Sequence, residues 1–319
     1  MSEVAEVSPG AEARGRLPQE TPDGQGKTGS ERMLERVTGT LAKIHVAQVH
    51  RDPWPDYAAF QADRYPSELR RAAALQWAGR ARAEHGSVHQ FAALTHALAE
   101  ARAPLHLLGA LSRLITDEVR HAEMCAATAL AIYPEGVPDE RRLFGWPSPK
   151  APWRDAPRPS DGDGAILQWT AEAVLVANCI GEALSRPMLD ALALVSTDPL
   201  AEGVCRQILR DEHLHATFGW ETLGWLMPQL DDQGRAAVQQ RLTRSLRGFE
   251  RSTTCGISIA EVAESTITIE RTSDPEREPN LGTLSDMQYA MIFYATLETD
   301  IFPRLRDLGL DPDAAWAAR

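Results

Sequence analysis

The sequence has little that would support a disulfide framework, a structural zinc site or a membrane span. It contains four cysteines, Cys125, Cys179, Cys205 and Cys255, and none has a CxxC or other paired spacing. We therefore expect reduced thiols. No run of 18 apolar residues occurs, and the first residues are acidic where a signal peptide is basic and then apolar. These absences predict a cytoplasmic protein that has no membrane partner.

Lysine and clustered positive charge are also scarce. The basic residues are 30 arginines and 3 lysines scattered along the chain, and the formal net charge is −12. A phosphate backbone is bound by clustered basic side chains, so an acidic chain without a basic patch is poorly suited to it. We predict no nucleic-acid partner.

The sequence does contain a strong helical periodicity, with apolar residues recurring every three to four positions. The predicted helices cover residues 67–101, 104–132, 164–195, 199–227, 232–250 and 284–307. Pro104 and Pro199 each suit the first position of a helix, and Pro187 should kink the third helix. The sequence therefore predicts an all-α protein.

Two segments interrupt this pattern. Residues 1–30 are rich in Gly, Pro, Glu and Ser, which predicts a disordered tail. Residues 134–163 are rich in proline and long enough to cross the end of a helical bundle, so we interpret them as a crossover. We expect one domain over residues 31–319, with a bundle core at 67–226 and a C-terminal extension at 227–319. Within the extension, residues 251–280 have no assigned structure.

One acidic pentad occurs twice in the predicted bundle core. The two copies are Asp117-Glu118-Val119-Arg120-His121 and Asp211-Glu212-His213-Leu214-His215. In each, a glutamate and a histidine three residues apart lie on one helix face and can share a metal ion. Chance alone gives roughly 0.04 matches to Asp-Glu-x-x-His in such a sequence, and there are two. Each copy also follows a helix that carries another glutamate, Glu84 or Glu182.

A glutamate or histidine on an arginine- and alanine-rich helix is ordinarily a solvated surface residue. Here six such side chains are in phase with the apolar stripes, which favours a buried metal site. They are Glu84, Glu118, His121, Glu182, Glu212 and His215. Four buried carboxylates without metal would repel one another, whereas two divalent ions cancel their charge. Oxygen and nitrogen ligands suit iron or manganese better than structural zinc.

This pattern closely resembles the ferritin-like di-iron carboxylate superfamily, in particular its non-haem oxidase and oxygenase branch. The resemblance covers roughly residues 67–226. It implies a ferritin-like four-helix bundle with a long crossover between helices 2 and 3 and additional C-terminal helices.

The resemblance also implies two iron ions, with manganese as an alternative at one or both positions. Glu84 and Glu182 would be single-carboxylate ligands, Glu118 and Glu212 would bridge or chelate, and His121 and His215 would give each ion one imidazole. The same six residues would be catalytic.

Residues next to the motifs suggest how the ligands are held. Asp117 and Asp211 suit the role of acceptors for the imidazole N–H groups. Arg120 could neutralise one aspartate, whereas the second motif has Leu214 at the equivalent position. In ribonucleotide reductase small subunits, which belong to the superfamily that this pattern resembles, a radical tyrosine occupies the position one turn after this histidine. Here that position is Cys125, one turn after His121, which weighs against a tyrosyl radical. His45 and His50 precede the predicted bundle and are assigned no role.

The function implied by the resemblance is a monooxygenase-type, O2-dependent di-iron oxidoreductase. It would oxidise a small organic substrate by hydroxylation, N-oxygenation or desaturation, with electrons from an external reductase or ferredoxin. The alternative is a ferroxidase, an iron-handling ferritin-like protein; ferritins usually have a single histidine and a chain about half as long. A manganese catalase, a non-catalytic bundle and a tRNA-modifying enzyme are further alternatives. A homodimer is compatible with this class.

Overall fold

The computed structural model describes residues 38–51, 53–133, 162–270 and 278–319. These residues form helices and turns, and the described part of the chain contains no strand. The all-α class is thereby confirmed. The predicted tail and most of the predicted crossover lie outside the described residues.

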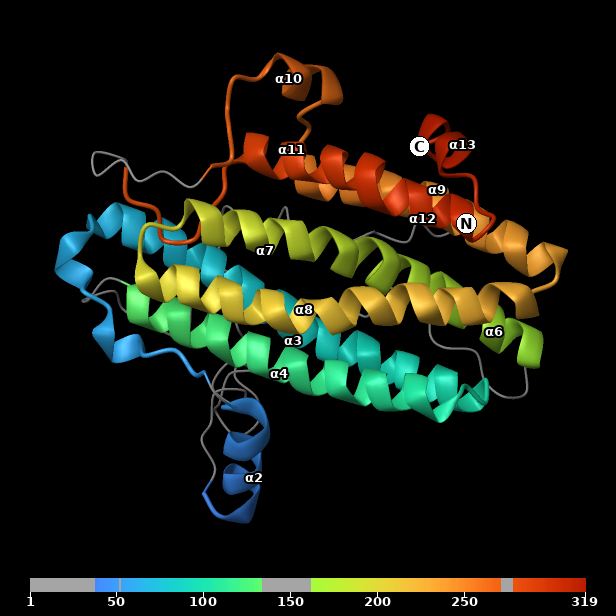
Figure 1. Ribbon diagram of the computed structural model, residues 1–319, viewed down its shortest axis with the longest axis horizontal. Coiled ribbons are helices and arrows are strands. Elements are labelled where there is room, and N and C mark those ends of the chain that lie inside the picture. Colours follow the sequence, from blue (N-terminus) through green and yellow to red (C-terminus); the bar gives the residue numbers. More distant parts are fainter. Residues whose placement is uncertain (1–37, 52, 134–161, 271–277) are drawn as a thin grey trace, which may run out of the picture.

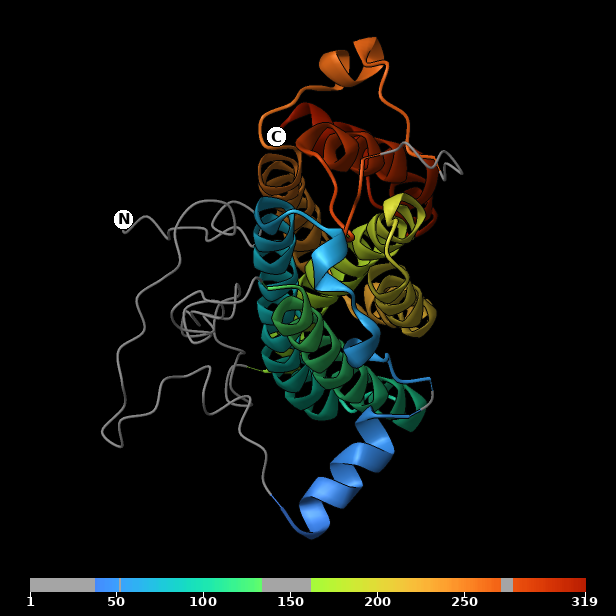
Figure 2. The same cartoon turned by 90° about the vertical axis from the view of Figure 1, so that its left-hand side faces the viewer.

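Four long helical rods lie side by side along the molecule (Figures 1 and 2). They are α3 (Ser67–Glu100), α4 (Leu105–Ile132), a composite rod of α6 (Asp163–Val174), the π-helix η5 (Leu175–Glu182) and α7 (Ala183–Val195), and α8 (Pro199–Leu226). The sequence predicts all four within one or two residues at each end. The N-terminus of α8 shows why: the Asp198 carboxylate accepts hydrogen bonds from two backbone N–H groups, and Pro199 occupies the first turn.

The composite rod departs from regular α-helix geometry over Leu175–Glu182. The sequence predicts a kink at Pro187, which lies within α7 five residues after the π-helix ends. A π-helix widens the backbone by one residue per turn and is frequent at functional sites. Its last residue here is Glu182, one of the six candidate ligands.

Two hydrophobic clusters fill the interior, one toward each end of the rods. One cluster contains the buried apolar residues of α3 up to Ala81 and those of α4 from Met124 onward. The other contains the buried apolar residues of α3 from Phe91 onward and those of α4 up to Leu114. Along α8, the boundary between the clusters falls after Ile208. The two Asp-Glu-x-x-His motifs and Glu84 therefore form a polar layer between two apolar ones.

The C-terminal helices cover the composite rod (Figure 1). They are α9 (Asp232–Thr254), α10 (Ile259–Glu264), α11 (Asp286–Thr296), the π-helix η7 (Leu297–Ile301), α12 (Phe302–Asp307) and α13 (Pro312–Ala317). α9 packs on α6, and α11 packs on α7 and α9. The predicted helix at 284–307 is present but is interrupted by η7. Part of the unassigned segment 251–280 forms α10.

The composite rod Asp163–Val195 is long and apolar enough to cross a membrane by length and composition alone. Half of its most apolar window is buried inside the protein. The core helix of a soluble protein passes the same test, so this property does not separate the two cases.

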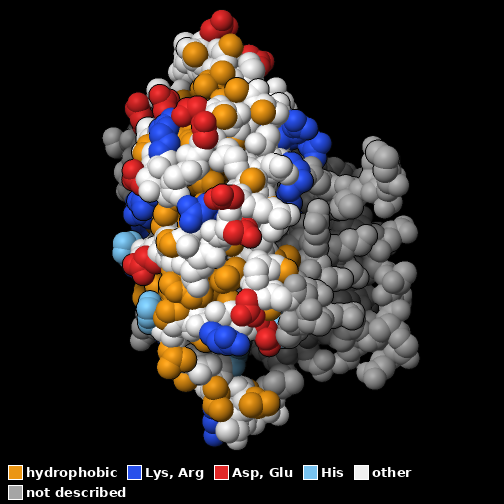
Figure 3. All heavy atoms as spheres, turned by 90° about the vertical axis from the view of Figure 1, so that its right-hand side faces the viewer, with side chains coloured by type: hydrophobic (Ala, Val, Ile, Leu, Met, Phe, Trp, Pro, Cys, Tyr) orange, Lys and Arg blue, Asp and Glu red, His pale blue; other side chains and the backbone are white. Residues whose placement is uncertain are grey.

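One further helix, α2 (Thr40–Val49), projects from the bundle beside α4 (Figures 1 and 2). Val49 is its buried residue, whereas Leu41, Ile44 and Val46 are exposed. Figure 3 shows hydrophobic side chains at the surface at this lower end of the molecule, with charges of both signs interspersed above. Apolar burial therefore does little to hold α2 against the bundle.

Candidate metal centre

The structure brings all six candidate ligands together at the polar layer between the hydrophobic clusters. They come from four rods: Glu84 from α3, Glu118 and His121 from α4, Glu182 from η5, and Glu212 and His215 from α8. The side chains contributed by α4 and α8 are at most 2% exposed, whereas those of Glu84 and Glu182 are 18% and 12% exposed. Solvent therefore reaches the cluster from the side of α3 and η5.

His121 lies at the centre of the first half of the cluster. Its Nδ1 atom is 3.8 Å from a Glu84 carboxylate oxygen and 3.6 Å from Glu212 Oε1. Glu84, Glu118 and His121 each offer one ligand atom, and these three atoms lie within 4.8 Å of one another. This half could hold one metal ion.

His215 has the same position in the second half. Its Nδ1 atom is 3.1 Å from Glu118 Oε1, 3.5 Å from Glu182 Oε2 and 3.7 Å from Glu212 Oε2. Glu118, Glu182 and His215 form a second group with ligand atoms within 4.8 Å of one another. The two groups share Glu118, and Glu212 approaches both histidines. This is the arrangement expected if those two glutamates lie between two ions.

The polar atoms of this cluster are left without hydrogen-bond partners. They are Glu118 Oε2, Glu212 Oε2, His121 Nδ1 and both ring nitrogens of His215. A buried polar atom without a partner costs free energy, and native proteins rarely leave several together unless an ion or water satisfies them. These atoms converge with the charge and ligand types of a metal site, so the residues fit a pair of divalent cations.

Two carboxylates of the cluster, those of Glu118 and Glu212, hold protons more tightly than ordinary glutamates. Burial and the charge of Glu84 raise the pKa of Glu118 to about 8. Burial likewise raises the pKa of Glu212 well above its ordinary value. Burial acts to raise the pKa of Glu84 too, but its contact with His121 holds it below the usual range. Divalent ions would have to displace the retained protons.

The two histidines are pushed toward the charged state. Burial acts to lower the pKa of His121, but hydrogen bonding to Asp211 and the nearby Glu84 raise it to about 10. The pKa of His215 is also well above its ordinary value, because the charge of Glu212 and contacts with Asp117 outweigh its burial. In the metal-free protein the imidazolium groups therefore offset part of the carboxylate charge.

The two motif aspartates approach the imidazoles in a crossed pattern. Asp211 Oδ2 lies 3.3 Å from Nε2 of His121, and Asp117 Oδ2 lies 3.9 Å from Nε2 of His215. Each aspartate thus faces the histidine of the other motif. Their predicted place beside the imidazoles agrees with this geometry, although the sequence does not predict the crossing.

Arginines neutralise both aspartates. Arg51 Nη2 donates to Asp117 Oδ1 at 2.6 Å and to Asp211 Oδ1 at 2.8 Å, and Arg113 Nε donates to Asp117 at 2.8 Å. Burial acts to raise the pKa of Asp117, but the nearby His215 and hydrogen bonds from Arg113 and Arg51 lower it to about 2. Both motifs are therefore supported by one guanidinium from outside the four rods.

Arg120 pairs with the aspartate of the other motif, since its Nε lies 3.4 Å from Asp211 Oδ2. Its terminal nitrogens donate to the backbone carbonyls of Val49, Arg51 and Pro53. Arg120 thereby fastens the segment after α2 to α4 and places Arg51 over the aspartates. Sequence reasoning missed Arg51 because it lies outside any periodic helix and its partners are distant in the chain.

Asn178 and Gly219 fix how closely the π-helix approaches α8. A Cβ atom at position 219 would lie 2.7 Å from Asn178 Cβ and 3.0 Å from its backbone carbonyl carbon. Gly219 lies four residues after His215, and Asn178 four residues before Glu182. The Asn178 amide is fully buried and neither of its polar atoms has a hydrogen-bond partner. The nearby Arg186 is exposed.

Three of the four cysteines pack in the interior as free thiols, and Cys255 is exposed. Cys125, one turn after His121, is fully buried, and its burial raises the pKa of the thiol well above the ordinary value. It lies in the hydrophobic cluster that adjoins the polar layer. Cys125 therefore packs as a small apolar side chain.

No protein-family model, curated protein or solved structure matches the chain.

Proposed function

We propose that the chain is a ferritin-like four-helix protein that holds two iron ions and uses O2 to oxidise a small organic substrate. The observation that carries this proposal is the pair of overlapping ligand groups that share Glu118 in the buried polar layer. Glu84, Glu118 and His121 would hold one ion, and Glu118, Glu182 and His215 the other. Glu212 would contact both.

The ligand set supports iron chemistry. Four carboxylates carry a formal charge of −4 when ionised, which two divalent cations cancel. Six ligands of mixed oxygen and nitrogen type, without a thiolate, suit iron or manganese. Two iron ions in such a site would supply the electrons that reduce O2, and an external reductase or ferredoxin would restore them.

The residues around the six ligands would orient the imidazoles and shield the metal centre from bulk water. Asp211 would hold the His121 imidazole by its Nε2 atom, and Asp117 faces Nε2 of His215 at 3.9 Å, so both Nδ1 atoms are directed at the carboxylates. The hydrophobic clusters above and below exclude bulk water, which strengthens electrostatic contacts inside. Because Glu84 and Glu182 are the more exposed ligands, we propose that O2 and substrate approach from their side.

Metal content and oxygen consumption test this proposal. Protein loaded anaerobically with Fe(II) should bind two ions per chain at the buried centre and, on exposure to O2, consume about one O2 per metal pair before stalling without substrate and reductant. The Glu118→Ala variant should consume none above background.

Excess Fe(II) in the same experiment separates the oxygenase from its alternative. Many turnovers of Fe(II) with mineral formation would instead identify an iron-handling protein. Failure to bind any iron would overturn both functions.

A further inference from the structure

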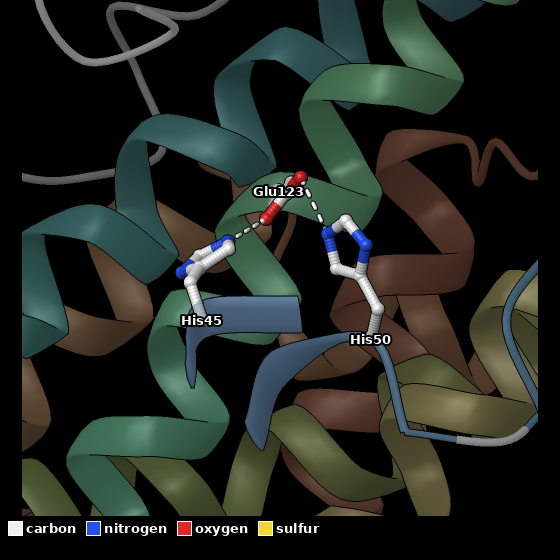
Figure 4. A group of neighbouring side chains, drawn as sticks. All are labelled: His45, His50 and Glu123. Carbon is white, nitrogen blue, oxygen red and sulfur yellow. Dashed lines mark hydrogen bonds and ion pairs between the residues drawn. The ribbon is translucent and has the colours of Figure 1, made fainter. Parts of the chain in front are cut away.

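A second cluster of metal-ligating side chains lies outside the buried centre, where α2 meets α4. Glu123 follows His121 by two residues and lies between the side chains of His45 and His50 (Figure 4). Its Oε2 is 2.8 Å from Nε2 of His45, and its Oε1 is 2.7 Å from Nε2 of His50. The three side chains therefore converge on one point from two helices.

This cluster could hold a metal ion with an open coordination position. The ligand atoms of His45, His50 and Glu123 lie within 4.8 Å of one another. A zinc ion about 2.0 Å from each ligand would place tetrahedral ligand atoms about 3.3 Å apart. The imidazoles would thus need to withdraw from the carboxylate by roughly 0.5–0.6 Å. The side chains are 42%, 23% and 27% exposed, so water can complete the coordination.

We propose that His45, His50 and Glu123 bind one divalent transition-metal ion of the zinc type, independently of the buried centre. Two imidazoles, one carboxylate and a water form a common four-coordinate zinc set. The site does not depend on the proposed function, because none of its three residues belongs to the buried cluster.

The surroundings of His50 favour a fixed ligand over a mobile surface histidine. Its ring stacks on Trp54 at 4.0 Å between centroids. The guanidinium of Arg120 also lies over the Trp54 ring, 5.4 Å from its centroid. A ring that is already oriented loses less conformational entropy when it binds an ion.

The ion would clamp α2 and the segment after it to α4. α2 buries little apolar surface, and its neighbour Arg51 reaches both motif aspartates. Binding at His45, His50 and Glu123 would therefore hold the backbone that delivers Arg51. We infer that this outer ion stabilises the support of the buried centre without contacting it.

Equilibrium dialysis of the full chain against Zn²⁺, followed by metal analysis, tests the proposal. The double variant His45→Gln/His50→Gln should bind one ion per chain fewer than the wild type. The matched control is His96→Gln/His106→Gln, which removes two exposed histidines from different helices that belong to none of the candidate metal groups among the described residues. It should bind as many ions as the wild type. Equal binding by the His45/His50 variant and the wild type would overturn the proposal, as would loss of the ion in the control.

The Glu118→Ala variant separates this site from the buried one. It should lose the buried ions and retain the outer one, so failure of the buried centre does not remove the expected difference of one ion.

Proteolysis gives a second readout. Zn²⁺ should slow tryptic cleavage after the exposed Lys43 of α2 in the wild type and not in the His45→Gln/His50→Gln variant. Equal rates with and without Zn²⁺ in the wild type would contradict the clamp.

Discussion

The two helical hairpins contribute the same inner residues but differ in what supports them. Each supplies one glutamate from its first helix and an Asp-Glu-x-x-His motif from its second. The first hairpin presents Glu84 from the regular helix α3, whereas the second presents Glu182 from a π-helix. The inner cluster is thus nearly symmetric, and its supports are not.

The outer residues show the difference most clearly. α4 carries Arg113 and Arg120 around its aspartate, whereas the equivalent positions of α8 are Gln207 and Leu214. The charge partners of the second motif come from outside its own helix, since Asp211 contacts Arg120 of α4 and Arg51 of the N-terminal segment. The ligand pattern is therefore repeated in both hairpins, whereas the arginines that stabilise both aspartates come from α4 and the N-terminal segment.

Removing the shared ligand should have the largest effect. Glu118 belongs to both ligand groups, whereas Glu84 and Glu182 each belong to one. We expect Glu118→Ala to lose both buried ions, and Glu84→Ala or Glu182→Ala to lose mainly one. Iron analysis after anaerobic loading measures this. Equal losses in all three variants would contradict a shared ligand.

The metal-free protein should become less stable as pH rises above about 4.5. The pKa of Glu118 is about 8 in the folded protein, so its stabilising contribution is complete below the unfolded pKa and is lost as pH rises through 8. His121, with a pKa of about 10, acts in the same direction from about pH 6.5 upward. The loss attributable to Glu118 is on the order of 5 kcal/mol.

Urea unfolding at several pH values measures this slope. Glu118→Gln should flatten it between pH 4.5 and 8, and bound metal should reverse it. A metal-free wild type whose stability is constant or rises over this range would argue against a buried carboxylate cluster.

The crossed pairing of aspartates and histidines can be tested in a variant that retains only one of the two metal positions. In Glu182→Ala, which retains the His121 half, adding Asp211→Asn should weaken binding of the remaining ion about 10- to 100-fold. Asp117→Asn should weaken it less, because Asp117 faces His215. Isothermal titration with Fe(II) or Mn(II) compares the two. The reverse order would mean that each aspartate serves its own motif.

The smallest expected effect concerns the π-helix. Gly219→Ala would place a methyl group against the Asn178 backbone, which cannot move without shifting Glu182. We expect a loss of about 1–3 kcal/mol in unfolding free energy and weaker metal binding. Gly203→Ala on the same helix meets no atom within 4 Å and is the matched control, expected to be neutral or slightly stabilising. Similar results for both would show that the close approach is unimportant.

The sequence predicts the rods and the six inner residues because both depend on helical periodicity. A glutamate in phase with Trp77 and Phe91 must face inward if that stripe is buried, and Glu84 does. Periodicity does not reveal Arg51, because its partners come from distant helices, or the π-helix, because nothing in residues 175–182 breaks the helical pattern. Periodicity likewise assigns no role to His45 and His50, because only the fold brings them to Glu123.

Anomalous diffraction at the iron edge from crystals loaded with Fe(II) is the most direct test of the metal centre. Two peaks should appear about 3.5–4 Å apart, one beside His121 and one beside His215, with the Glu118 carboxylate between them. A single peak, or no peak among the six side chains, would contradict the dinuclear centre.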